Sequence, residues 1–142
     1  MHANATRPAP WHLWVVALLT FLWNGAGAVT IALAQTGNRL DMDPSEIAYY
    51  TAQPRWFVVT TDIATVLPVL AAVALLRRSR SAVWLFLLSL ALIISNNAYD
   101  VAAGTSLALR GEDWRVLTSV IATIALAQFA YAWVIKRRGL LV

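Results

Sequence analysis

Two carboxamides and a carboxylate follow a long apolar run in the third hydrophobic segment of the chain. Residues 82–95 are almost wholly apolar, and Asn96, Asn97 and Asp100 come directly after them. On a helix, residues four apart share a face, so Asn96 and Asp100 lie together and Asn97 flanks them. Such groups can accept hydroxyl or cationic groups of a ligand, or they can hydrogen-bond one helix to another.

Polar side chains of two other hydrophobic segments fall at a similar depth. Asp62 lies seven residues into the second segment, roughly two helical turns, which places it level with Asn96. Asn24 lies somewhat deeper in the first segment, and Trp23 and Tyr99 offer aromatic surfaces for stacking. The predicted ligand-binding residues are Trp23, Asn24, Asp62, Asn96, Asn97, Tyr99 and Asp100.

Two interpretations of these residues stand side by side. An ionisable side chain at mid-membrane costs upward of about 2.5 kcal/mol, so its presence suggests a function. In the first interpretation the residues line a water-filled pocket. In the second, Asp62 and Asp100 extend toward the headgroups while the asparagines hydrogen-bond neighbouring helices. The second is favoured for Asp100, whereas Asp62 and Asn96 fit both equally well.

The sequence offers little for catalysis. It has no cysteine, and its two histidines, His2 and His12, lie near the N-terminus without the spacing of metal ligands. No serine–histidine pairing and no phosphate-binding glycine loop is evident. We therefore expect no catalytic residue, no metal and no cofactor, and an enzyme acting on a lipid or quinone is the weakest of the functional hypotheses.

The elements that carry these residues are four apolar segments of membrane-spanning length. Of the 142 residues, 60% are hydrophobic and 13% are charged, against about 45–50% and about 25% in soluble domains. The segments cover about residues 11–35, 55–76, 82–104 and 114–135, and roughly 20 residues suffice to cross a bilayer. Backbone hydrogen bonding in lipid requires helices. We predict a single all-α membrane domain over residues 1–142, an up-and-down bundle of four transmembrane helices.

Basic residues predict the orientation. With four spans, one side of the membrane holds seven of them in tight clusters: Arg7, Arg77, Arg78, Arg80, Lys136, Arg137 and Arg138. The other side holds Arg39, Arg55, Arg110 and Arg115, diluted by acidic residues. Clustered basic residues stay in the cytoplasm, so both termini are expected there, in a bacterial inner membrane. The net charge of +4 is explained by topology, and no nucleic-acid partner is expected.

The first outer loop and the first span each carry a local signal. In "DPSEI", Asp43 is a good N-cap and Pro44 suits the first helical position, so a short interfacial helix is predicted over about 44–52. Tyr49 and Tyr50 are expected to lie at the headgroup level. The first span also resembles a secretory signal that ends in "ALAQ". Its apolar stretch is long for a signal peptide, so we expect it to be retained.

Several stretches resemble a known family in order and spacing: "PWHLWVVALLTFLWNGAGA", "PSEIAYYTAQPRW", "LLRRSRSAVWLFLLSL" and "YAWVIKRRGLLV". The family consists of small four-span alphaproteobacterial membrane proteins that often carry the automatic label "sugar transporter". The resemblance covers nearly the whole chain and implies a four-span fold and solute transport. Relatives tend to carry a "YD"-like pair late in the first span, where this sequence has "GAVTIAL". Here the acidic residues of the spans are Asp62 and Asp100 instead.

Two functional hypotheses follow. The first is a small transporter or solute-binding bundle with a polar pocket open to the periplasm, which would need to form a homo-oligomer to build a pathway. The alternative is an accessory subunit or assembly factor of a larger membrane complex, in which the polar groups bond to a partner helix and no solute moves. Both predict the lipid bilayer as the surrounding medium.

Overall fold

The computed structural model describes residues 9–35 and 43–142, and within these ranges every regular element is a helix. The four long helices are α1 (Trp11–Gln35), α3 (Arg55–Leu76), α4 (Ser81–Ala103) and α6 (Glu112–Arg137). Each is long and apolar enough to cross a membrane. The predicted all-α bundle of four long apolar helices is therefore confirmed, and the protein is a small multi-pass integral membrane protein.

The apolar surface of the helices fits a bilayer. Large side chains such as Trp11, Trp84 and Val116 are 76%, 60% and 64% exposed, respectively. In water, such surface would lose the hydrophobic stabilisation of about 25 cal/mol per Å² that burial provides. Lipid tails remove this cost, and the helices need to bury only the faces with which they contact each other.

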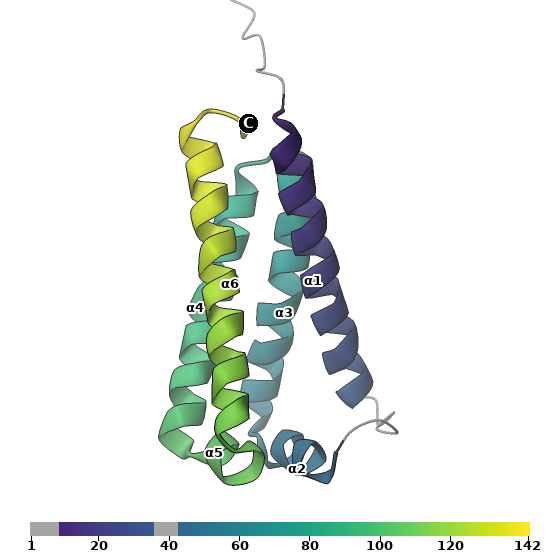
Figure 1. Ribbon diagram of the computed structural model, residues 1–142, viewed down its shortest axis with the longest axis vertical. Helices are drawn as coiled ribbons and strands as arrows, with labels where there is room; N and C mark the ends of the chain where they lie inside the picture. The colour runs from purple at the N-terminus through teal and green to yellow at the C-terminus, as the bar shows by residue number, and fades with distance from the viewer. Residues whose placement is uncertain (1–8, 36–42) are drawn as a thin grey trace, which may run out of the picture.

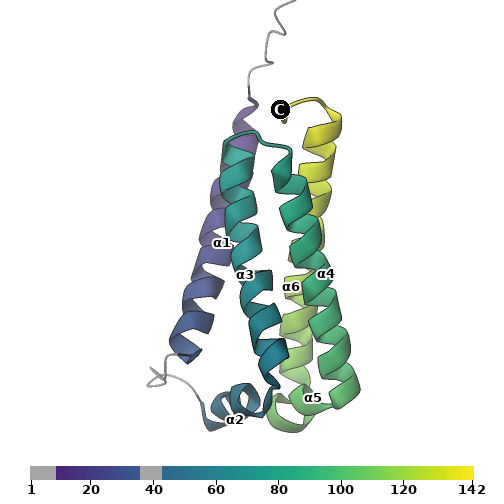
Figure 2. The same ribbon diagram turned by 180° about the vertical axis from the view of Figure 1, so that it is seen from behind.

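The helices lie in the order α1, α3, α4, α6, each packed along the next. In Figures 1 and 2, α1 diverges from the other helices toward the end of the bundle that holds the two short helices. We call this end, with α2 (Pro44–Ala52) and α5 (Thr105–Arg110), the cap end. The opposite end holds the start of α1, the α3–α4 turn and residues 138–142, and we call it the tail end.

The tail end contains the continuous apolar core. Its buried members come from all four long helices and from the C-terminal segment, and include Leu13, Leu75, Phe86, Ile135 and Leu141. Here α1 and α6 are joined by a 2.8 Å hydrogen bond between His12 Nδ1 and the Tyr131 hydroxyl. This end of the bundle is therefore closed by packing and by a direct bond across the first and last helices.

The C-terminal segment is fastened to the α3–α4 turn. The Val142 N–H donates to the Arg78 carbonyl at 2.6 Å, and the Arg80 N–H donates to the Val142 carbonyl at 3.1 Å. The Nε atoms of Arg78 and Arg80 donate to the carbonyls of Leu140 and Leu141 at 2.9 and 3.4 Å. Arg78 has a φ of 57°, a left-handed conformation that is uncommon outside glycine. The surrounding hydrogen bonds hold this turn in place.

At the cap end, α2 covers the predicted range and begins at the predicted residue. The Asp43 carboxylate caps it by accepting the Ser45 N–H at 2.7 Å. The short helix α5 was not predicted. It arises because Gly104 (φ 68°) ends α4 and Gly111 (φ 74°) ends α5, two left-handed positions that favour glycine. As a result α4 ends at Ala103, while α6 begins at Glu112, before the predicted start at residue 114.

Candidate functional site

Buried polar atoms without a hydrogen-bond partner gather at the cap end. Among the described residues they are Gln53 Nε2 and Oε1, Asp100 Oδ1, Arg110 Nε, Trp114 Nε1 and Arg115 Nε. All belong to the end of α2, the last turn of α4, α5 or the first turn of α6. Each such atom costs about 1–3 kcal/mol when it stays unsatisfied. A concentration of them at one end marks a place where water or a ligand would be stabilised.

Gln53 opens onto a pocket between α1, α2 and α3. The cavity has a volume of about 290 Å³, and its walls are Ile31, Ala34, Tyr50, Gln53, Phe57, Val58 and Thr61. Gln53 is the C-cap of α2 and has an extended backbone (φ −74°, ψ 138°), which the following Pro54 favours. Its side chain is only 9% exposed, although neither its amide nitrogen nor its amide oxygen has a partner.

Thr61 connects this pocket to Asn96 of α4. The Asn96 Nδ2 donates to the Thr61 hydroxyl at 3.0 Å, and the Thr60 hydroxyl donates to Asn96 Oδ1 at 2.9 Å. Asn96 is thus held between two adjacent threonines of α3 and is only 7% exposed. The Thr61 oxygen accepts from Asn96, and its O–H remains able to donate to another acceptor.

Asp100 lies behind α2, next to Tyr49 and Trp114. Both Asp100 and Tyr49 are buried, and the rings of Tyr49 and Trp114 are 5.2 Å apart. Burial raises the pKa of the Tyr49 hydroxyl well above its ordinary value, and the charge of Asp100 raises it further. Tyr49 therefore stays neutral and can donate its proton to the carboxylate. The Tyr49 ring is buried between α2, α4 and α6, and the headgroup level expected for Tyr49 and Tyr50 stays a prediction.

Arg110 fastens the two short helices to each other and to α6. Its guanidinium lies 3.5 Å from the Glu46 carboxylate, donates to the Ser45 hydroxyl at 3.3 Å and stacks 4.6 Å from the centre of the Trp114 ring. Its positive charge also contributes to lowering the pKa of Asp43, after the hydrogen bonds from Ser45. Asp43 therefore remains an ionised N-cap of α2. Through these contacts α2 and α5 are fastened together and pack over Asp100.

The predicted site residues do not form one cluster. Asn96 and Asp100 are both buried but have different neighbours, Thr60 and Thr61 for the first and Tyr49 for the second. Asn24 donates to the Thr20 carbonyl of its own helix at 2.8 Å.

The remaining predicted residues are less buried than Asn96 and Asp100. Trp23 is 51% exposed on α1, and Asp62 and Asn97 are half-buried. The Tyr99 ring packs against Trp56 and Phe57 at centroid distances of 4.7 and 5.7 Å. Tyr99 is therefore occupied by aromatic neighbours at the start of α3.

Sequence reasoning missed Gln53, Thr60, Tyr49 and Arg110. Two signals pointed toward two of them: Gln53 stands between a predicted helix and Pro54, where the chain must turn inward, and Arg110 lies directly before Gly111 after an apolar span. No three histidine or acidic side chains in ranges 9–35 and 43–142 are placed to hold a metal ion.

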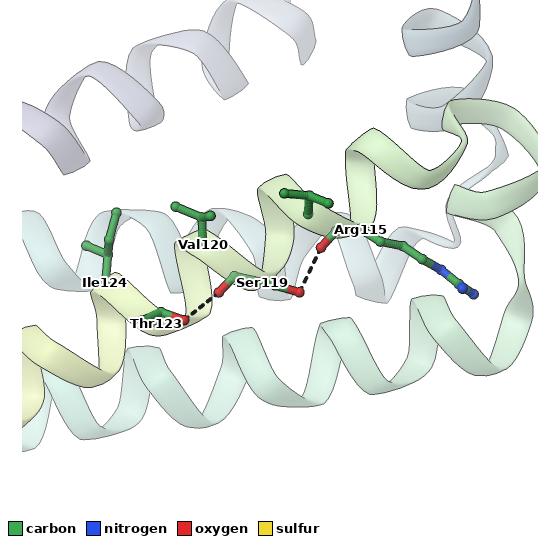
Figure 3. A pocket seen from close by; sticks show the side chains of 6 residues that line it. Arg115, Ser119, Val120, Thr123 and Ile124 are labelled. Atoms are coloured by element: carbon green, nitrogen blue, oxygen red, sulfur yellow. Dashed lines mark hydrogen bonds between the residues drawn. The ribbon is translucent and has the colours of Figure 1, made fainter.

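A second hollow, of about 430 Å³, runs along the exposed side of α6 (Figure 3). It is lined by Arg115, Val116, Ser119, Val120, Thr123 and Ile124, all from the same helix. The Ser119 and Thr123 hydroxyls each donate at 2.8 Å to the backbone carbonyl four residues earlier, as the dashed lines show. With its hydroxyls already satisfied, this hollow suits an apolar surface better than a polar solute.

Comparisons with family models, with curated proteins and with solved structures found no match to this chain. The side chains of this small integral membrane protein are therefore the main basis for inferring its function.

Proposed function

We propose that the protein binds a small, neutral, hydroxyl-bearing solute, such as a sugar or polyol, in the Gln53 pocket, as one step of solute transport. The observation that carries this proposal is the Gln53 side chain, which lies in a pocket with two polar atoms that are buried and unpartnered. A buried amide is stable only if something satisfies it. A hydroxyl group, which both donates and accepts, can serve both of its atoms.

The composition of the pocket favours a neutral ligand. Among the seven lining residues, Gln53 supplies a donor and an acceptor, Thr61 supplies a hydroxyl, and Tyr50 and Phe57 supply aromatic surface. None of the seven carries a carboxylate, an ammonium or a guanidinium group. The volume of about 290 Å³ is near the lower end for small-molecule sites. The resemblance to the family labelled "sugar transporter" points to the same class of solute.

The distribution of charge supports an orientation for this pocket. Six basic residues lie at or beside the tail end: Arg77, Arg78, Arg80, Lys136, Arg137 and Arg138. Positive clusters stay in the cytoplasm, so we place the tail end there and the pocket toward the periplasm of an inner membrane. Four spans are few for a complete transport pathway, so we further propose that the protein works as a homo-oligomer.

Solute binding can be tested with one substitution and a matched control. Purified protein in nanodiscs is titrated with radiolabelled hexoses and polyols, and with sodium and potassium ions as charged comparators. We expect binding of at least one neutral solute, and Gln53→Leu should weaken it about tenfold or more because the ligand loses two hydrogen bonds. Thr51→Val is the control, since the Thr51 hydroxyl is exposed and bonds only to carbonyls of its own helix.

The proposal fails if no neutral solute binds, or if Gln53→Leu binds as tightly as the unaltered protein. Binding of a cation alone would shift the site away from this pocket to Asp62 or Asp100.

The alternative function, an accessory subunit of a larger complex, is favoured by the hollow along α6. Val116 and Val120 are 64% and 46% exposed beside it, so a partner helix could pack there. Val120→Trp would fill the hollow. If this alternative holds, the substitution removes a partner protein that otherwise copurifies in mild detergent, and solute binding is absent in both forms.

A further inference from the structure

We propose that the tail-end surface between α4 and α6 binds the headgroup phosphate of an anionic phospholipid, with Lys136 as its central contact, independently of the Gln53 pocket. The Lys136 Nζ lies 5.3 Å from the ring centre of Trp84 on α4 and 5.3 Å from that of Trp133 on α6. Two aromatic rings from neighbouring helices therefore hold one ammonium group at the surface.

Both rings face the surroundings of the bundle. Trp84 is 60% exposed and Trp133 is 41% exposed. Trp84 lies one turn inside the start of α4, and Trp133 lies one turn before the end of α6. Tryptophan at this depth marks the boundary between hydrocarbon and headgroups. The ammonium beside the two rings is then at the level of the lipid phosphates.

The charge around Lys136 is positive. Arg137 is its neighbour in the sequence, and Arg80, four residues before Trp84, adds a further positive charge at the start of α4. The described acidic side chains all lie in the half of the molecule nearer the cap end: Asp43, Glu46, Asp62, Asp100, Glu112 and Asp113. Among the described residues the ammonium of Lys136 has no ion pair. Its three N–H donors are available to a phosphate.

The apolar surface next to the Trp84 and Trp133 rings favours a lipid over a soluble phosphate as the ligand. Leu88, one turn further into α4 than Trp84, is 50% exposed, and Leu126, about two turns from Trp133, is 55% exposed. Acyl chains can lie along these residues while the phosphate contacts Lys136. A soluble phosphate would use only the polar half of this surface.

Native mass spectrometry of the full chain in mild detergent tests this site. The protein is titrated with dioleoyl phosphatidylglycerol and, separately, with dioleoyl phosphatidylcholine, and the first bound lipid is counted. We expect phosphatidylglycerol to bind at least about fivefold more tightly, and Lys136→Gln to reduce that preference about fivefold. This factor corresponds to about 1 kcal/mol for each basic residue near an anionic surface. Lys136→Arg should retain the preference.

Three further variants keep the test decisive. Arg55→Gln removes an exposed basic residue at the cap end and should leave the preference unchanged. Trp84→Leu and Trp133→Leu should each lower the preference, which gives a second readout if Lys136→Gln is unstable. Equal binding of the two lipids, or an unchanged preference in Lys136→Gln, would overturn the proposal. So would competition of inorganic phosphate at millimolar concentration with the lipid, because the acyl chains would then contribute nothing.

Discussion

Four arginines allow the two ends of the bundle to be compared directly. At the tail end, the Nε atoms of Arg78 and Arg80 donate to backbone carbonyls of the C-terminal segment. At the cap end, the Nε atoms of Arg110 and Arg115 are buried and have no partner. The same atom type is thus satisfied at one end and left unsatisfied at the other.

The two ends also differ in how tightly the helices pack. The tail end joins all four long helices in one apolar core, and the His12–Tyr131 bond links the first helix to the last. Toward the cap end α1 diverges (Figure 1). A pocket lies between α1, α2 and α3 at that end. We therefore assign stability to the tail end and the proposed solute binding to the cap end, which agrees with the general finding that functional sites carry locally unfavourable interactions.

The largest effect on stability is expected in the tail-end core. Leu13 is fully buried there. Leu13→Ala should lower the free energy of unfolding by about 2–3 kcal/mol, because it leaves a cavity and removes packing contacts. Unfolding in mixed micelles of mild detergent and dodecyl sulfate would measure it. Leu18→Ala, on the exposed side of the same helix, is the matched control and should change stability little. Equal effects of the two would mean that the tail end has no special core.

A smaller effect is expected at high pH from the cap end. Burial and the Asp100 charge raise the pKa of Tyr49 above that of an unfolded tyrosine, near 10. Above pH 10 the unfolded state therefore loses a proton that the folded state keeps, so stability falls as pH rises. The loss should approach about 1 kcal/mol one unit above pH 10. Tyrosinate absorbance and the free energy of unfolding are measured as functions of pH. Tyr49→Phe should remove part of the fall in stability above pH 10.

Ionisation of the Tyr49 hydroxyl with the ordinary pKa of tyrosine would contradict the structure. Tyr99→Phe is the control for this titration, because it removes a tyrosine that packs at the start of α3.

The smallest effect is expected from the hydrogen bonds that cross between α3 and α4. Asn96→Leu removes both bonds to Thr60 and Thr61, and buried bonds between membrane helices contribute about 0.6 kcal/mol on average. Asn24→Leu removes a bond within a single helix and should have less effect. The difference between the two variants in the unfolding assay measures the contribution of the cross-helix bonds. A larger loss for Asn24→Leu would contradict this assignment.

The sequence predicted the parts of the fold that depend on hydropathy and helix caps. The four long helices follow from apolar length, and α2 follows from Asp43 and Pro44. The predicted depth of Asn96 also agrees with the structure, because it bonds Thr60 and Thr61, next to Asp62. These features depend on local composition or on counting along a helix.

The remaining features depend on how the elements turn and face each other. The α5 segment is too short to show helical periodicity, and the glycines on either side of it are typical of a loop. The direction in which Tyr49 faces is decided by the position of α2 over α4 and α6, which no local pattern contains. Gln53 becomes a pocket residue only because α1 diverges at that level.

We propose that the Gln53 amide has no hydrogen-bond partner in the protein because it binds a solute. The most direct measurement is the melting temperature of unaltered protein and of Gln53→Leu, each with and without the solute found by titration. Removing an unpartnered buried amide should raise the melting temperature of the free protein, and the solute should stabilise only the unaltered form. A lower melting temperature for free Gln53→Leu, or equal stabilisation of both forms by the solute, would contradict the claim.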